Sequence, residues 1–330
     1  GYAALRLNTT ADNNTAVGRS ALEANTTGHS NTAVGTCSSK ATTTAAGNTA
    51  VGFKSLFAAT TGGDNTAVGE LALAAMTDAT ENVAVGRCAL AGNTTSGGNT
   101  AVGFRALTTQ VAGGVSNTAV GHNALTANST GDCNTAVGHA ASDSNTTGSS
   151  NTSVGKNALF TNLGGDQNVA VGTDAMLSNT TGESNVGIGK NALCLNTTAS
   201  GNTAVGTYSV RDTTTGCYNT GIGYSALRVN STGDQNVAVG RESLDHNTTA
   251  DNNTAVGYKS LFTNTTGTNL VAIGENALAA STTASNNTAV GVAALDSTTT
   301  GAGNSGVGVS ALTANTTGAN NAAVGKDSGG

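Results

Sequence analysis

A 17-residue unit repeats along almost the whole chain, and this repeat constrains the fold more than any other feature of the sequence. Its consensus is Asn-Thr-Ala-Val-Gly-x-x-Ala-Leu-x-x-Asn-Thr-Thr-Gly-x-x, numbered here as positions 1 to 17. The Gly at position 5 recurs 19 times from Gly18 to Gly325, in steps of 17 with one step of 18 between Gly103 and Gly121. Short periods of this kind are typical of solenoids, in which each unit buries its apolar face only against its neighbours. We therefore expect residues 1–330 to form a single repeat domain.

The composition agrees with a stacked array of coils rather than with a globular core. Leu, Ile, Val and Phe make up about one residue in six, which is low for a globular domain. The net charge of −6 is too small to favour disorder, and position 4 is Val or Ile in every unit. The chain contains no Pro, as expected where almost every strand is internal. The sequence predicts an all-β fold, a parallel β-solenoid (β-roll) of about 19 coils with 17 residues per coil and a length of roughly 90 Å.

The alternation within one unit predicts the path of a coil. Positions 2 to 4 and positions 7 to 9 read as two strands, separated by the Gly at position 5, and Asn-Thr-Thr-Gly reads as a second corner. We expect positions 2 and 4 to point inward, so that Val17, Val34 and Val51 form a buried column facing the Leu at position 9. Position 3 is Ala, Gly or Ser in all 19 units, which predicts a close approach by another part of the structure. A second chain is the first candidate, and a neighbouring backbone or opposing strand is the alternative.

Three further features of the unit predict local structure. The Gly at position 5 is expected at a corner with positive φ, because phosphate-binding loops do not recur 19 times in a chain. The Asn at position 1 is expected to form a ladder of stacked amides. The extra residue between Gly103 and Gly121 predicts a bulge around residues 110–116, with both flanking strands in register.

The charged residues are sorted by position in the repeat, which predicts a basic edge and an acidic edge. The 13 Lys and Arg residues occupy positions 6, 7 and 10, and eight acids occupy positions 16 and 17. Aromatic residues join the basic residues at position 6. A solvated variable corner explains these side chains, and a strip that contacts glycans or surfaces is the functional alternative. The candidate strip comprises Phe53, Phe104, Tyr224, Tyr258, Arg87 and Arg241.

The second corner carries a recurring Asn-x-Thr acceptor sequence for N-linked sugars. Asn-Thr-Thr-Gly is also good turn chemistry, so the pattern has a purely structural explanation. Because it is placed on a turn, the Asn side chain is expected to be exposed to solvent. The candidate attachment sites are Asn8, Asn25, Asn93, Asn128, Asn145, Asn179, Asn196, Asn230, Asn247, Asn264 and Asn315.

Metal binding, catalysis and nucleic-acid binding are not predicted. His122 and His139 occupy position 6 in consecutive coils, but no Cys or third His joins them, so we expect no metal and no cofactor. Acid pairs one coil apart, such as Asp234 and Asp251, approach the carboxyl separation of retaining glycosidases, but no cleft is predicted around them and we expect no enzyme.

Nucleic-acid binding is not predicted, because an acidic chain lacks the positive electrostatic field that attracts phosphate groups. The five cysteines occupy columns that predict no disulfide framework, and no segment is apolar enough to cross a membrane.

The recurring Asn-Thr-Ala-Val-Gly has Ile variants at residues 185–189, 219–223 and 270–274. It resembles the Asn-Ser-Val-Ala-Ile-Gly repeat of trimeric autotransporter adhesin heads, and also repeats of bacteriophage tail-fibre proteins. The resemblance covers the whole chain and implies a left-handed β-roll, three chains around one axis, and attachment to surfaces. The unit of this chain is longer than the adhesin head repeat. Because both ends fall in mid-unit, we expect a segment of a longer fibre.

These observations favour a structural extracellular fibre or fibre shaft, on a cell surface or a virion, in which copies of the chain associate as a homotrimer or end to end. A single-chain solenoid is the alternative to the trimer. A shaft that binds host or surface glycans is an alternative function. Ice binding is another, suggested by the Thr ladders although position 2 mixes Thr with Val.

Overall fold

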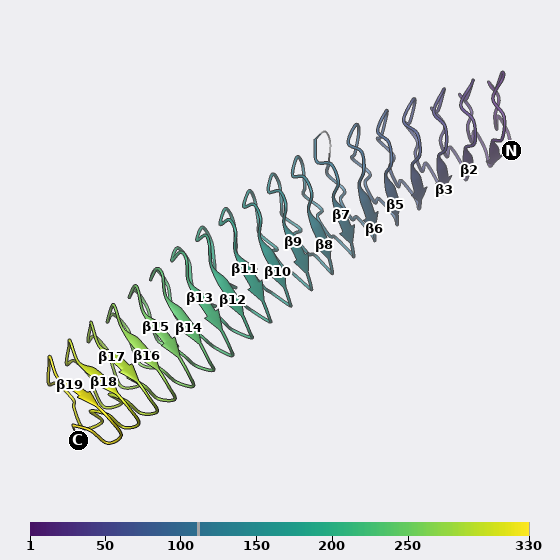
Figure 1. Cartoon of the computed structure of the whole chain (residues 1–330). Coiled ribbons are helices and arrows are strands. Elements are labelled where there is room, and N and C mark those ends of the chain that lie inside the picture. The colour runs from purple at the N-terminus through teal and green to yellow at the C-terminus, as the bar shows by residue number, and fades with distance from the viewer. Residues whose placement is uncertain (111–112, 330) are drawn as a thin grey trace. The chain divides into compact units, whose positions relative to one another are not determined.

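The protein is described by a computed structural model that covers residues 1–110 and 113–329, and all regular elements in these ranges are short β-strands (Figure 1). No helix in the described ranges is long and apolar enough to cross a membrane. The chain divides into two compact units, Gly1–Gln167 and Asn168–Gly330, called unit 1 and unit 2.

Each unit contributes one three-residue strand per coil. Unit 1 contains β1 (Thr15–Val17), β2 (Thr32–Val34), β3 (Thr49–Val51), β4 (Thr66–Val68), β5 (Val83–Val85), β6 (Thr100–Val102), β7 (Thr118–Val120), β8 (Thr135–Val137) and β9 (Thr152–Val154). Unit 2 contains β10 (Val169–Val171), β11 (Val186–Ile188), β12 (Thr203–Val205), β13 (Thr220–Ile222), β14 (Val237–Val239), β15 (Thr254–Val256), β16 (Val271–Ile273), β17 (Thr288–Val290), β18 (Ser305–Val307) and β19 (Ala322–Val324).

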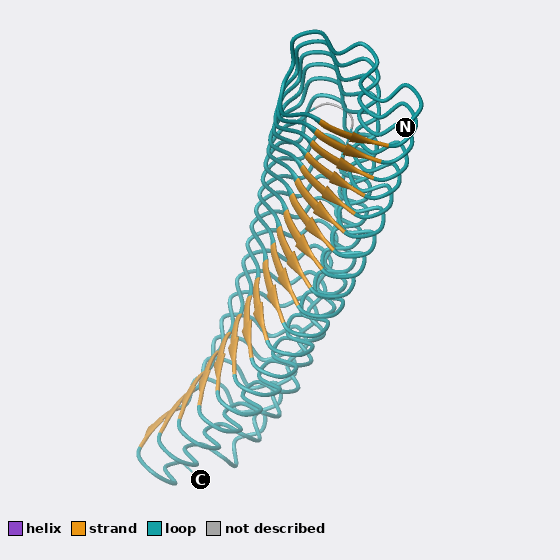
Figure 2. Cartoon of the chain, turned by 90° about the vertical axis from the view of Figure 1, so that its right-hand side faces the viewer, coloured by secondary structure: helices purple, strands orange, loops and turns teal. Residues whose placement is uncertain are grey.

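Within each unit, consecutive strands pair in parallel and residues 17 apart are partners, as in Thr32↔Thr49. Figure 2 shows the strands of each unit as one ladder, with loops forming the remaining sides of the coils. The predicted all-β parallel β-solenoid with a 17-residue coil is therefore confirmed. β6 and β7 also pair in register, with Thr100 opposite Thr118, so the extra residue leaves the flanking strands aligned as predicted. Residues 111–112 of the predicted bulge lie outside the described residues.

The interior of a coil is narrow and is filled by small side chains facing larger ones. In unit 1, Ala67 and Ala84 at position 3 are fully buried in one cluster with Leu56, Leu73 and Leu90 at position 9. At Gly187, which occupies position 3, the space available for a side chain is very small. A Cβ added to Gly187 would lie 2.9 Å from Cγ of Met176, which occupies position 9 of the preceding coil. Position 3 is therefore restricted by the chain's own position 9.

This arrangement reverses the predicted direction of the strand side chains. Val17 is 56% exposed and Val34 and Val51 are each 36% exposed, whereas Ala33 and Ala50 are completely buried. The predicted inward column of Val was therefore wrong, and so was the inference that position 3 meets a second chain. Alternation along a strand separates positions 2 and 4 from position 3, but it does not say which face is inside. The narrow interior admits only the small residue.

Positions 7 to 9 do not form the predicted second strand. Positions 7 and 9 are left-handed, for example at Cys37 (φ 57°) and Leu22 (φ 48°), which is uncommon for side chains of this kind. The segment still bonds to the neighbouring coils. The Cys37 amide donates to the Arg19 carbonyl at 2.9 Å, and the Ser39 amide donates to the Ser55 carbonyl at 3.0 Å. These bonds to neighbouring coils satisfy backbone groups along a turning path.

The Gly at position 5 is required by both its conformation and its surroundings, as predicted. Gly35 has a φ of 136°, which L side chains rarely adopt. A Cβ at Gly35 would also lie 2.4 Å from the carbonyl oxygen of Gly52 in the next coil. Any larger residue would therefore separate adjacent coils at this corner.

The Asn at position 1 forms the predicted ladder, and its amide has a second role. The Asn48 amide N–H donates to Oδ1 of Asn31 at 3.0 Å, and Nδ2 of Asn65 donates to Oδ1 of Asn48 at 3.1 Å. Nδ2 of Asn48 also donates to the carbonyl of Gly62 at 2.9 Å, across the same coil. These side chains are buried. Each Asn therefore links its coil to its neighbours and connects the strand to the second corner.

We predict that Ala84→Leu lowers the free energy of unfolding by about 1–3 kcal/mol, because the added volume has no space opposite Leu73 and Leu90. Val68→Leu is the matched control. Its side chain points outward, so its effect should be within about 0.5 kcal/mol. Guanidinium titration followed by circular dichroism measures both values. Equal effects of the two substitutions would contradict the assignment of the interior.

Candidate functional site

In each unit the outer surface of the strands is a face without charge, which we call the Thr/Val face and define as positions 2 and 4 of β1–β9 in unit 1 and of β10–β19 in unit 2. In unit 1, position 2 is Thr in eight of nine strands and position 4 is Val in all nine. In unit 2, position 2 is Thr, Val, Ser or Ala, and position 4 is Val or Ile. Contiguous exposed apolar surface is typical of interaction sites in soluble proteins.

The Thr hydroxyl groups on this face are free of protein partners within the described ranges. Thr32, Thr49 and Thr66 make no side-chain hydrogen bond there, in contrast to the Thr at position 13. Thr26, for example, donates its hydroxyl to the Thr43 carbonyl of the next coil at 3.0 Å. Thr at position 13 therefore stabilises the stack, whereas Thr at position 2 has hydrogen-bonding capacity for something outside the coil.

The Asn at position 12 is buried in nearly all the candidate glycan sites, so the predicted exposure was wrong. Asn25, Asn145, Asn179 and Asn264 are at most 1% exposed. Of the candidates, only the two nearest the chain ends are not buried: Asn8 is exposed and Asn315 is half-buried. The other buried candidates are Asn93, Asn128, Asn196, Asn230 and Asn247.

The amide group at position 12 is used for a second ladder. Nδ2 of Asn145 donates to Oδ1 of Asn128 at 2.8 Å and to the carbonyl of Gly148 at 2.9 Å. Nδ2 of Asn162 in turn donates to Oδ1 of Asn145 at 2.7 Å. A sugar on Nδ2 would break these bonds and would have to occupy the interior of the coil. The recurring acceptor sequence is therefore explained by turn and ladder chemistry.

The predicted surface strip is exposed, as expected for position 6. Phe53, Phe104, Tyr224 and Tyr258 are all 38–49% exposed. The members of the strip form separate contacts in each unit and not one continuous cluster. Arg241 lies over Tyr224 and Tyr258, with distances from its Cζ atom to the ring centroids of 5.9 and 5.8 Å. In unit 1, Cζ of Arg87 lies 5.9 Å from the Phe104 centroid, and Phe53 contacts Lys54 instead of another member.

His122 and His139 continue this position 6 column in unit 1. Their rings are stacked with centroids 5.2 Å apart, and His122 stacks on Phe104 at 5.1 Å. Among the described residues, no group of three or more His, Cys, Asp or Glu side chains could hold a metal ion. The pair is therefore part of a ring stack on the surface of unit 1.

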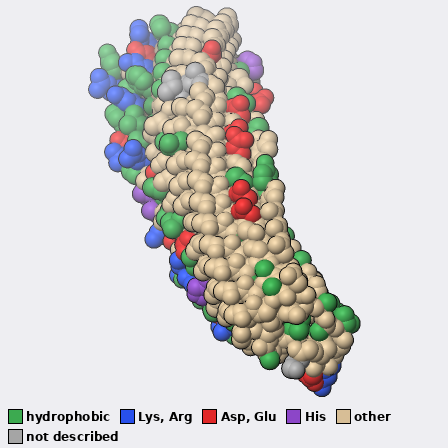
Figure 3. Space-filling model, turned by 90° about the vertical axis from the view of Figure 1, so that its left-hand side faces the viewer, with side chains coloured by type: hydrophobic (Ala, Val, Ile, Leu, Met, Phe, Trp, Pro, Cys, Tyr) green, Lys and Arg blue, Asp and Glu red, His purple; other side chains and the backbone are tan. Residues whose placement is uncertain are grey.

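The acidic column has a structural explanation. Figure 3 shows Lys and Arg gathered along one edge and a column of acids along another. Oδ1 of Asp132 accepts a hydrogen bond from the Val115 amide at 2.7 Å, and Oδ1 of Asp251 accepts one from the Asp234 amide at 2.8 Å. Ser149 takes the same role toward the Asp132 amide at 3.1 Å. In these coils position 16 supplies an acceptor for an amide of the preceding coil, and an acid is one residue that can do so.

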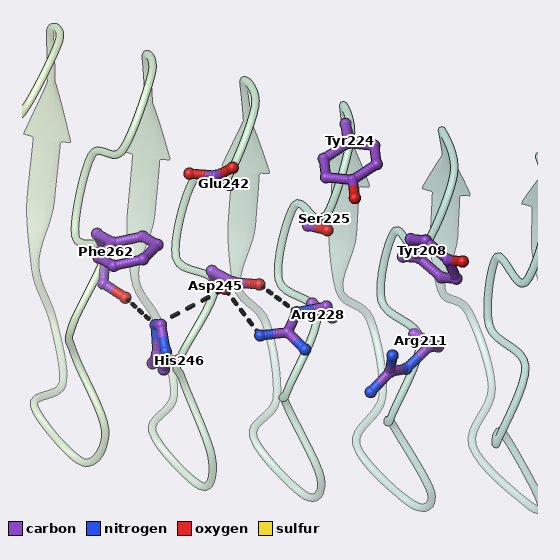
Figure 4. Close-up of a pocket in the computed structure, with 9 residues that line it drawn as sticks. All are labelled: Tyr208, Arg211, Tyr224, Ser225, Arg228, Glu242, Asp245, His246 and Phe262. Carbon is purple, nitrogen blue, oxygen red and sulfur yellow. Dashed lines mark hydrogen bonds and ion pairs between the residues drawn. The ribbon is translucent and has the colours of Figure 1, made fainter.

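The surface of unit 2 contains a groove, which we call the Tyr–Arg groove (Figure 4). Its volume is about 440 Å³, and it runs between the side chains of positions 6 and 7 and those of positions 10 and 11 over four consecutive coils. Its lining residues are Tyr208, Arg211, Tyr224, Ser225, Arg228, Glu242, Asp245, His246 and Phe262.

A partly buried ion pair lies in this groove. Arg228 donates from Nε and Nη2 to the two carboxylate oxygens of Asp245 at 2.8 and 3.1 Å. The Asp245 side chain is 5% exposed and that of Arg228 is 29% exposed. The hydrogen bond to Asp245 raises the pKa of Arg228 above its ordinary value, so the guanidinium remains charged. Nδ1 of His246 lies 3.7 Å from Asp245 and 3.0 Å from the carbonyl of Phe262.

Of the residues that line this groove, only Tyr224 was predicted from the sequence to be functional, as a member of the surface strip. The functional residues that were not predicted include Tyr208, Arg228, Asp245 and His246. The 17-residue spacing could have indicated the ion pair, because Arg211, Arg228 and Asp245 occupy position 10 of three consecutive coils. What the sequence did not reveal is that positions 6 and 7 lie across from positions 10 and 11.

Comparison with known proteins gives no further assignment. No family model matches the chain, and searches of curated proteins and of solved structures found no match. The resemblance to adhesin heads and tail fibres therefore stays a prediction.

We predict that Arg228→Ala lowers the free energy of unfolding by about 1–3 kcal/mol, because it leaves the buried Asp245 carboxylate without its bidentate partner. Adding Asp245→Ala should recover part of this loss. The control is Arg241→Ala, which removes an exposed pair with Glu242 and should cost at most about 1 kcal/mol. Denaturant titrations of these variants and of Asp245→Ala alone give the comparison. A double variant that shows the full sum of both single losses would contradict coupling of the pair.

Proposed function

We propose that this chain is a structural module of an extracellular fibre and that its copies associate through the Thr/Val face. The observation that supports this proposal is the column of Val or Ile at position 4, which recurs in every strand of each unit and is exposed or half-buried. A stacked β-solenoid is compatible with a fibre-like role. The face repeats with the coil, so two copies aligned in parallel make the same contact at each step.

The physical advantage of such an association lies in the composition of the face. Positions 2 and 4 carry no ionisable residue, so bringing two faces together removes no charge from water. Coils about 4.8 Å apart give the face of unit 1 a length of roughly 38 Å over nine strands. Apolar contact along this length contributes in proportion to the area removed from water. Three copies around one axis, as the resemblance implies, would cover the face on each copy.

The interior strengthens this argument. Its buried apolar side chains are mostly Ala and Leu, so a single coil removes little apolar surface from water. Association through the Thr/Val face would add the larger Val and Ile side chains to the buried area. The extracellular location belongs to the same proposal and rests on the resemblance.

We predict that the double substitution Val34→Lys and Val68→Lys abolishes self-association, because Lys at position 4 would bring ammonium groups into a desolvated interface. Both side chains are 36% exposed in the single chain, so the coils should still form. The matched control is Thr44→Lys with Thr61→Lys, on exposed corners away from the face. Mass measurement by light scattering distinguishes the forms, and circular dichroism reports folding.

The proposal predicts a wild-type mass that is a multiple of the chain mass, retained in the corner variant and reduced to one chain in the face variant. A wild-type protein that is monomeric at micromolar concentration would contradict it. So would an oligomer that persists in the face variant, because another surface would then hold the copies together.

Ice binding is a second candidate for the same face, favoured by the free Thr hydroxyls. Positions 2 and 4 form a regular grid with spacings of about 4.8 Å along the stack and roughly 7 Å along the strand. This function requires the face to be open to water. A monomeric wild type that inhibits ice recrystallisation, with loss of inhibition in the face variant, would support it over self-association.

A further inference from the structure

We infer that the Tyr–Arg groove of unit 2 is a binding site for an extended, uncharged oligosaccharide. This inference goes beyond the structural role proposed above and does not depend on it, because the groove and the Thr/Val face use different positions of the repeat. The groove combines aromatic rings with planar hydrogen-bonding groups, and this combination suits a ligand that has both apolar and hydroxyl-bearing surfaces (Figure 4).

The shape of the groove favours a chain-like ligand. Its lining residues come from four consecutive coils, and three steps of about 4.8 Å give it a length of roughly 14 Å. A hexose unit in an extended oligosaccharide is about as long as one step. Successive sugars could therefore meet equivalent positions of successive coils, in register with the repeat.

Aromatic rings provide the apolar contacts. Tyr208 and Tyr224 lie edge to face with centroids 6.0 Å apart, and Phe262 packs edge to face with His246 at 4.6 Å. Tyr224 is 49% exposed, which leaves ring surface for a ligand. Aromatic side chains of this kind contribute a rigid apolar surface and, in Tyr, a polar hydroxyl group. Sugar rings present C–H faces to such surfaces and direct their hydroxyl groups to the sides.

The charges of the groove are already paired, which favours an uncharged ligand. Arg228 is bound by Asp245, and Arg211 donates to the two carboxylate oxygens of Asp212 at 2.5 and 2.7 Å. Glu242 lies within 3.0 Å of Arg241 and 3.6 Å of Lys259. An anionic ligand would have to compete with these carboxylates for the guanidinium groups. Sugar hydroxyl groups can instead bond to the remaining N–H groups and carboxylate lone pairs.

The ion pairs also hold the polar groups in place before a ligand arrives. Arg228 is fixed at two nitrogens by a nearly buried carboxylate, and Nδ1 of His246 is engaged by the Phe262 carbonyl. A ligand therefore has few side chains to order on binding. Such pre-organisation increases affinity by lowering the entropic cost.

The experiment uses a panel of neutral tetrasaccharides, namely cellotetraose, maltotetraose, mannotetraose and chitotetraose, with tetragalacturonate as an acidic probe. Binding to the full chain is measured by calorimetry and by ligand-observed NMR. The variants are Tyr224→Ala in the groove and Tyr218→Ala as the control. Tyr218 is 67% exposed in the same unit and does not line the groove.

We expect at least one neutral tetrasaccharide to bind, with about tenfold weaker binding in Tyr224→Ala and unchanged binding in Tyr218→Ala. The inference is overturned if no neutral member of the panel binds at millimolar concentration. It is also overturned if tetragalacturonate binds in preference, or if Tyr218→Ala reduces binding as much as Tyr224→Ala. A monomeric wild type would contradict the proposed fibre association, but the binding experiment would still test the oligosaccharide site in the same way.

Discussion

The narrow space between position 3 and position 9 is the constraint on which the remaining structure depends. Because Ala at position 3 packs in one cluster with Leu at position 9, the interior cannot admit a larger residue on the strand. Alternation then forces positions 2 and 4 outward, and the Val and Ile side chains of the repeat are left on the surface. The same constraint therefore produces a compact coil and an exposed apolar face. A wider coil would have buried its Val column and left no such face.

The stack is held in register by polar groups inside it. Asn48 at position 1 and Asn145 at position 12 are nearly or fully buried, and each uses its amide to contact the preceding or following coil. Buried amides are costly unless their hydrogen bonds are made, so any slip in register would leave these groups unsatisfied. The ladders thus specify the 17-residue step. At Leu270 the first ladder loses an amide, although the Leu270 N–H still donates to Asn253 at 3.0 Å.

The repeat made the class of fold, the coil length and the strand register predictable, because a fixed period leaves one simple way to stack equivalent residues. It also predicted the ladder at position 1 and the corner Gly. It did not predict the direction of Val34, since period-two alternation is symmetric and hydrophobicity alone favoured the wrong face. It did not predict the left-handed backbone at Leu22, because no residue type at position 9 signals positive φ. Asn145 was placed on the surface because an Asn in a turn is usually solvated, whereas here the neighbouring coils supply its partners.

The candidate sites follow from what the repeat leaves free to vary. Positions 1, 3, 5 and 12 are constrained by ladders and by packing, so differences between coils accumulate at positions 6, 7, 10 and 11. Variation at those positions can place a local site on a uniform scaffold without altering the coil, as Tyr208, Arg228 and Asp245 do in unit 2. The Thr/Val face is different, because it repeats at every step and suits a partner with the same period. A uniform face for assembly and a variable edge for recognition can therefore coexist in one chain, since the narrow interior assigns them to separate sides of the coil.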